Sequence, residues 1–188
     1  MKKTLIWILA AVVAAAVILL CVKRCNPDPE PQPEPVEVTF NQAFESDYDY
    51  MAEKFDTCFN FYEVQVELDG TLDSLGTNVK VAKMTSVAQT DDSVYFFVRE
   101  HGLDGEVEIK TLHDIWLESA KFTKEDVKVT LEEALMVLND SLETLPATKF
   151  VTLRNPIGPT LHEYPFYIFG QMLSTVNAGT GKVNDFVF

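Results

Sequence analysis

The sequence is poor in basic residues. Among its 188 residues, 15 are lysine or arginine and 29 are aspartate or glutamate, which gives a formal net charge of −14. Proteins that bind DNA or RNA use basic side chains to neutralise phosphates, usually along one face. This chain has no basic stripe, so we expect no nucleic-acid partner. Its 13 phenylalanines and six tyrosines supply enough apolar surface for a folded core, which argues against global disorder.

The sequence also lacks the short motifs that mark common catalytic and ligand sites. It has no Gly-x-Ser-x-Gly, no His-Glu-x-x-His, no cysteine pair with zinc spacing and no calcium loop. Gly179-Thr-Gly-Lys182 is similar to part of a phosphate-binding loop, but Val176 and Val183 stand where that loop needs glycine and serine or threonine. We therefore expect no enzyme activity, cofactor, nucleotide or metal, and keep a hydrolase that uses acidic residues as a weaker alternative.

Two groups of polar residues are candidate sites. His113 and Asp114 are neighbours with Glu118 close by, but adjacent residues point to different faces of a strand, so a structural histidine is favoured. The segment Asp47-Tyr-Asp-Tyr50 could coordinate a cation through its carboxylates. A solvated polar helix face, with both tyrosines at the edge of the core, is the simpler interpretation.

Cysteine is scarce, with three residues in the chain, at Cys21, Cys25 and Cys58. Cys21 lies in an apolar segment and Cys25 directly after it, so the sequence predicts no disulfide framework within a domain. Cys58 falls on the apolar side of an expected helix, where we expect a buried thiol.

Residues 1–25 have the character of a membrane anchor. Thr4 to Val22 is an uncharged run of nineteen residues, long enough to cross about 30 Å of hydrocarbon as a helix. Cleaved signal peptides share these features, but the residues before Cys21 and Cys25 suit lipoprotein cleavage poorly. We expect an uncleaved single-pass anchor, with a lipoprotein as the alternative. Basic residues flank both ends of the run, so charge leaves its orientation open.

A proline-rich stretch follows at residues 26–35. Proline alternates with polar residues there, and five of the nine prolines of the chain lie in it. Alternating proline favours extended polyproline II structure, so we expect a stiff spacer that holds a folded body away from the membrane. A proline-rich peptide ligand would need basic and apolar flanking residues that this stretch lacks.

The folded body contains two similar helix starts. Residues 36–44 (VEVTFNQAF) align with residues 127–135 (VKVTLEEAL), with four identities in nine positions. In both, a threonine can cap a helix, and a glutamine or glutamate three residues later can complete a capping box. The two expected boxes are Thr39 with Gln42 and Thr130 with Glu133. A common way of starting a helix would also explain this similarity without an internal repeat.

The spacing of apolar residues predicts which structure follows each start. Apolar residues at helical intervals indicate a long helix from Phe40 to Phe59 and a shorter one from Leu131 that stops before Pro146. Alternation of apolar and polar residues then indicates strands. The expected strands are Tyr62–Leu68, Val79–Met84, Ser93–Arg99, Glu106–Leu112, Lys149–Arg154, Phe166–Gly170, Leu173–Asn177 and Lys182–Phe188.

This order of elements predicts an α+β fold. Runs of strands after a helix are typical of antiparallel sheets that carry a helix on one face. We expect two such units, a first at residues 36–126 and a second at residues 127–188, after the anchor and the spacer.

Three pieces of the second unit carry a family resemblance: Val129-Thr-Leu-Glu-Glu-Ala-Leu135, Tyr167-Ile-Phe-Gly170 and Val176-Asn-Ala-Gly-Thr-Gly-Lys-Val183. Together they look like a PepSY domain. Asn177 stands where the family usually has aspartate, and the loop at residues 155–164 is longer than expected. The layout of anchor, spacer and two such units further resembles cell-envelope proteins of the Bacteroides type. The resemblance implies an extracytoplasmic, non-catalytic role, often proposed as protease inhibition or regulation.

Residues 26–188, which comprise the spacer and the body, carry 29 acidic and 11 basic residues. We expect the body to bind a protein partner. The location expected for it is the periplasm, with the anchor in the inner membrane. We expect binding at an exposed strand edge of the second unit. The candidate residues of that edge are Phe166, Ile168, Gly170, Val183 and Phe186. A scaffold subunit of an envelope complex, dimerising through small residues of the anchor, is the alternative.

Overall fold

The computed structural model describes residues 38–56, 58–76, 80–117, 119–157, 162–170 and 174–183. The predicted anchor at residues 1–25 and the predicted spacer at residues 26–35 lie outside the described residues. Within the ranges described, no helix has the length and apolar character needed to cross a bilayer.

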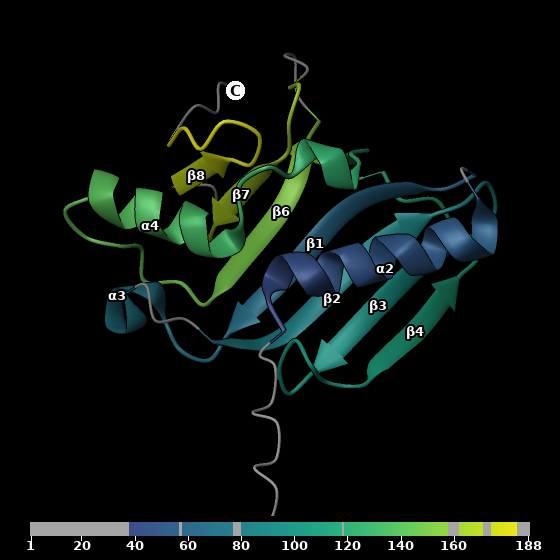
Figure 1. Ribbon diagram of the computed structural model, residues 1–188, viewed down its shortest axis with the longest axis horizontal. Helices are drawn as coiled ribbons and strands as arrows, with labels where there is room; N and C mark the ends of the chain where they lie inside the picture. The colour runs from purple at the N-terminus through teal and green to yellow at the C-terminus, as the bar shows by residue number, and fades with distance from the viewer. Residues whose placement is uncertain are drawn as a thin grey trace, which may run out of the picture. The chain divides into compact units, whose positions relative to one another are not determined.

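The described residues form helices and strands in the order that Figure 1 shows. The helices are α2 (Phe40–Phe55), α3 (Leu72–Leu75), η1 (Lys124–Asp126, a 3-10 turn) and α4 (Leu131–Ser141). The strands are β1 (Asn60–Leu68), β2 (Val81–Gln89), β3 (Val94–Glu100), β4 (Val107–Leu112), β5 (Ser119–Ala120), β6 (Phe150–Pro156), β7 (Phe166–Phe169) and β8 (Ser174–Asn177).

All of these strands belong to one antiparallel sheet of eight strands, in the order β4-β3-β2-β1-β6-β7-β8, with β5 paired to β6. The pairing of β1 with β6, from Glu63 with Arg154 to Glu67 with Phe150, joins the two halves of the chain. The predicted α+β class is confirmed. The expectation of one sheet per unit was wrong, because the strands of both predicted units continue into each other.

Both long helices pack on the same face of this sheet, as Figure 1 shows for α2 and α4. α2 buries Phe40, Ala43, Phe44 and Met51, and α4 buries Leu131, Ala134, Leu135 and Leu138. These side chains share one hydrophobic core with inward residues of the central strands, such as Val64, Val66 and Leu153. We call the opposite side of the sheet, which neither long helix covers, the open face.

Both predicted capping boxes are present. The hydroxyl of Thr39 accepts a hydrogen bond from the Gln42 backbone N–H (3.3 Å), and the Gln42 side chain accepts one from the Thr39 N–H (3.0 Å). Thr130 and Glu133 make the same pair of bonds at 3.1 and 2.8 Å. The two helix starts thus use the same local chemistry to satisfy backbone donors that have no partner inside the helix.

The first helix is shorter than predicted. α2 ends at Phe55, and Asp56 takes a positive φ of 55°, a conformation that interrupts a helix. Cys58 therefore leaves the helical register, and the structure places it on the surface. The expectation of a buried thiol was wrong for this reason.

Most predicted strands are present with shifted ends. Seven of the eight expected strands correspond to β1, β2, β3, β4, β6, β7 and β8. Lys182–Phe188 is represented by a single bridge between Val183 and Val176, and residues 184–188 lie outside the described residues. The short elements α3, β5 and η1 were not predicted, because two to four residues carry too little periodicity to read.

Candidate functional site

The predicted binding edge at Phe166–Gly170 is not an edge. β7 pairs with β6 on one side and with β8 on the other. Phe166 and Ile168 are only 1% and 2% exposed, and the Gly170 N–H donates to the carbonyl of Phe150 (3.0 Å). These residues have neither free backbone groups nor accessible side chains to offer a partner strand. The prediction was wrong in placing an exposed edge here.

The other predicted edge residues lie near the end of the described chain. Val183 is half-buried and forms its bridge to Val176 beside β8, so it lies next to the last strand of the sheet. Phe186 lies outside the described residues.

The exposed edge of the sheet is at its other end, in β4. All six residues of β4 are exposed. Among the described strands, only β3 pairs with β4. Figure 1 shows β4 as the outermost strand at that end of the sheet. Its outward N–H and C=O groups are therefore free, within the described structure, to pair with another extended segment.

The two faces of β4 differ in character. Ile109 lies opposite Phe97 in the pairing of β4 with β3. Phe97 belongs to the hydrophobic core, and its ring packs edge-on against the ring of Tyr50 in α2, with 5.5 Å between the ring centroids. Val107, Ile109 and Thr111 therefore lie on the helix side of the sheet, where Val107 and Ile109 are each 36% exposed. A strand added to β4 would meet a half-covered apolar row on this side.

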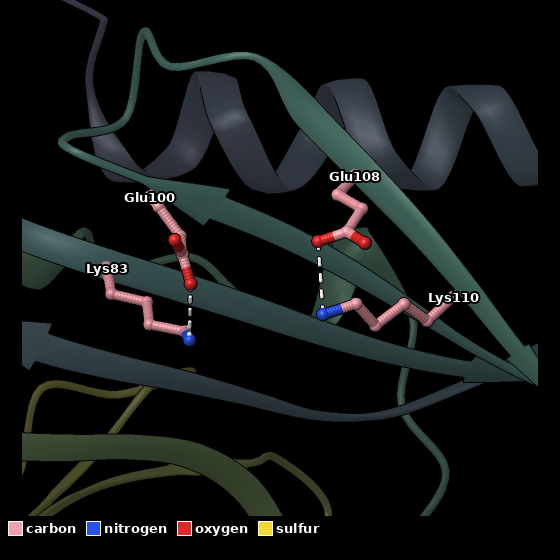
Figure 2. A network of polar contacts seen from close by, with 4 residues as sticks. All are labelled: Lys83, Glu100, Glu108 and Lys110. Carbon is pink, nitrogen blue, oxygen red and sulfur yellow. Dashed lines mark hydrogen bonds and ion pairs between the residues drawn. The ribbon is translucent and has the colours of Figure 1, made fainter.

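Charged side chains lie on the open face next to this edge, as Figure 2 shows. Lys83 of β2 pairs with Glu100 of β3 at 2.9 Å, and Lys110 pairs with Glu108 at 3.0 Å within β4. The hydrogen bond from the Lys83 ammonium lowers the pKa of Glu100 and raises that of Lys83. All four side chains are well exposed, so these pairs contribute little to stability but give the edge a defined charge pattern.

A cleft of about 750 Å³ lies near the starts of both long helices. Its wall includes Thr39 and Glu132 from the helix starts and His101 and Asp104 from the β3–β4 connection. Lys80, which is basic, and Asp69, which is acidic, also line it. Both helix N-termini already hold their own capping side chains. Acidic and basic groups are mixed in the wall, and no single ligand chemistry follows from them.

A buried polar cluster joins α2 to the sheet. Asp47 of α2 accepts a hydrogen bond from the Ser86 hydroxyl of β2 (2.6 Å) and lies 2.5 Å from the Arg99 guanidinium of β3. Burial raises the pKa of Asp47, while the Ser86 hydroxyl and the Arg99 charge oppose that rise. The three residues are 2%, 0% and 4% exposed, respectively, so a substrate has no access and the cluster serves to dock the helix.

This cluster corrects the interpretation of Asp47-Tyr-Asp-Tyr50. Asp47 does not belong to a solvated face; Asp49 does, and it pairs with Lys124 at 2.7 Å. The apolar spacing of α2 contained the missing signal, because Phe40, Ala43 and Phe44 predict that a residue at position 47 also faces the core. Ser86 and Arg99 were missed because their contact with Asp47 joins residues far apart in the sequence.

The remaining sequence candidates have structural surroundings. His113 Nδ1 lies 3.0 Å from the Ser93 hydroxyl, and Glu118 lies outside the described residues. Across the part of the chain that is described, no three His, Cys, Asp or Glu side chains come close enough to hold a metal ion.

The segment Asn177–Gly181 is a turn, as its sequence predicts. The Asn177 side-chain oxygen accepts hydrogen bonds from the backbone N–H groups of Gly179 (2.9 Å) and Thr180 (3.0 Å). Gly181 takes a positive φ of 73°, which glycine adopts without steric cost. The turn chemistry thus accounts for this glycine-rich segment.

Comparison with known proteins leaves the family open. No protein-family model and no curated protein matches the chain, so the PepSY-like resemblance of the predicted second unit, residues 127–188, stays a prediction. A solved structure that resembles the chain is that of a putative lipoprotein from Clostridium difficile 630. It is 15% identical in sequence, with a TM-score of 0.46 over 80% of this chain and 93% of that one.

Proposed function

We propose that the body is a non-enzymatic protein-binding module that takes up an extended segment of a partner at β4. The observation that carries the proposal is the exposure of all six β4 residues at the end of a sheet whose interior strands are well buried. Strand addition provides main-chain hydrogen bonds that are independent of sequence, and the side chains along the edge then select the partner.

The surroundings of β4 define which segments fit. On the helix side, Val107 and Ile109 favour apolar residues at alternate positions of the incoming strand. On the open face, Glu108 and Lys110 favour charged residues of the opposite sign at the positions between. An alternating apolar and charged segment is therefore the expected ligand, and a continuous apolar strand is not.

The proposal includes the predicted setting of the body. A single-pass anchor at residues 1–25 in the inner membrane, with a lipid-modified cysteine as the alternative, would hold the body in the periplasm at the end of the proline-rich spacer. Tethering raises the local concentration of neighbouring envelope proteins, so a weak edge contact can still be occupied. The PepSY-like resemblance suggests that the partner is a protease or its regulator.

Site-specific photocrosslinking in intact cells tests the proposal. A photoreactive residue is placed in the full-length chain at Leu112 of β4 or, as a matched control, at Met136 of α4. These side chains are 51% and 52% exposed, so random collisions label both equally. We expect an adduct of defined mass from Leu112 that is missing from Met136. Equal labelling, or no adduct at Leu112, would remove the basis for binding at β4.

A further inference from the structure

We infer that the segment that adds to β4 is the β4 strand of a second copy of this chain, in antiparallel register about a two-fold axis at Ile109. The inference rests on the proposed function, since it names the partner of the same edge. Its distinguishing observation is that β4 is complementary in charge to itself.

The geometry of antiparallel pairing restricts the registers that two copies of β4 can use. Residues directly opposite each other must lie on the same face of the sheet. In a symmetric pair, the two-fold axis therefore passes through one residue, which faces its own copy. Near the middle of β4, the axis can lie at Glu108, Ile109 or Lys110.

Charge decides between these three registers. An axis at Glu108 places two Glu108 carboxylates opposite each other, and an axis at Lys110 places two ammonium groups opposite each other. Like charges in directly opposite positions destabilise a strand pair. An axis at Ile109 instead places each Glu108 opposite the Lys110 of the other copy, so both charge pairs across the contact are attractive.

The same register matches the apolar side of the strand. Ile109 then faces Ile109, and Val107 faces Thr111, so the β-branched residues on the helix side meet β-branched residues. Val107 and Ile109, each 36% exposed in the single chain, lose part of that exposure. In the single chain Lys110 pairs with Glu108 of its own strand at 3.0 Å; pairing with the second copy exchanges this contact for an equivalent one across the interface.

Charge exchange in full-length chains tests the inference. Two differently tagged copies are co-expressed, and recovery of one with the other from membranes is measured. Glu108→Lys in both copies, or Lys110→Glu in both, places like charges at two symmetric positions and should reduce co-recovery by about tenfold. Glu108→Lys in one copy with Lys110→Glu in the other restores opposite charges, as does the double exchange in both copies, and each should recover co-purification.

Both positions are exposed, so folding of the variants is expected and is checked by circular dichroism of the purified full-length chain. The restoring combinations provide a second control, because a folding defect in either single variant would persist in the mixture. Unchanged co-recovery in both single variants would overturn the inference.

Disulfide trapping tests the register itself. In a chain whose three native cysteines are replaced by serine, Ile109→Cys should form a disulfide with its own copy in oxidised membranes. Opposite residues in antiparallel strands have Cα atoms roughly 4.5–5.5 Å apart, within the range of a disulfide. Thr111→Cys alone should not crosslink, whereas Thr111→Cys mixed with Val107→Cys should. Crosslinking of Lys110→Cys to itself in preference to Ile109→Cys would overturn the register.

The outcome at Leu112 separates this inference from the proposed function. An adduct with a second copy supports both. An adduct with a different protein, together with no Ile109→Cys disulfide, overturns self-pairing and leaves binding at β4 intact. No adduct and no disulfide overturn both.

Discussion

The strands at the two ends of the sheet differ in their surroundings. All six residues of β4 are exposed at one end, whereas all four residues of β8 are buried at the other, where Val183 bridges to Val176. The strands next to them do not differ in this way, because β3 beside β4 is mostly buried and β7 beside β8 is fully buried. The sheet is thus covered at the β8 end. Among the strands described, β4 is the one to which a further strand can add.

The helices above these two regions also differ. α4 buries an entirely apolar stripe, while α2 places Asp47 among its buried residues and joins it to Ser86 and Arg99. Buried ion pairs contribute less than apolar packing to stability, but they require one geometry to be satisfied. Besides its apolar contacts, α2 is therefore held on its half of the sheet by a directional ion pair, whereas the buried residues of α4 are all apolar.

The largest expected effect comes from placing the same positive charge near each end of the sheet. Ile168→Lys in β7 buries an ammonium group at a position that is 2% exposed, and we expect a loss of about 4 kcal/mol or more in the free energy of unfolding. Ile109→Lys in β4 should cost less than about 1 kcal/mol, because the new side chain extends into solvent. Urea unfolding of the purified full-length chain in detergent measures both.

A similar loss at the two positions would contradict this account of the sheet. Ile168→Val and Ile109→Val serve as size controls, because they remove one methylene group without adding charge. Ile168→Val should cost roughly 1 kcal/mol and Ile109→Val less.

The local features of this fold were readable from the sequence, and the long-range ones were not. The caps at Thr39 and Thr130 depend on residues three positions away, so pattern alone identified them. The pairing of β1 with β6 joins residues 83 to 91 positions apart, and no periodicity within either strand records it. Two units with matching element order therefore looked separate although they share a sheet.

The candidate edge was misplaced for a related reason, although the sequence held a signal. β7 reads Phe-Tyr-Ile-Phe without a polar residue, a pattern typical of a strand buried on both faces. β4 alternates Val107, Ile109 and Thr111 with Glu108 and Lys110, and charged residues of this kind are common on exposed edges. The charge content of the strands therefore favours β4 as the exposed edge.

Removing the buried ion pair that docks α2 should have an intermediate effect on the free energy of unfolding. Asp47→Asn leaves the Arg99 guanidinium, 4% exposed, without its anionic partner, and we expect a loss of about 3 kcal/mol in unfolding free energy. Asp47→Leu combined with Arg99→Met removes both charges and should recover most of that loss. Denaturant unfolding followed by circular dichroism measures each variant. A loss below about 0.5 kcal/mol in the single variant would show that the ion pair does not hold α2 in place.

The smallest expected loss of unfolding free energy comes from removing the threonine caps that α2 and α4 share. Thr39→Ala and Thr130→Ala each remove a hydroxyl that accepts a backbone hydrogen bond at a helix start, and each should lower the free energy of unfolding by about 1 kcal/mol. Thr71 is a matched control: it precedes α3, and its hydroxyl contacts the exposed Ser74 hydroxyl (3.0 Å) but makes no capping bond to a backbone N–H within the described structure. Thr71→Ala should therefore cost a few tenths of a kcal/mol at most. Thermal and urea unfolding of the three variants compares them directly. Equal small losses at all three positions would mean that the capping hydroxyls add nothing, whereas a loss at Thr130 alone would show that α2 depends on Asp47 rather than on its cap.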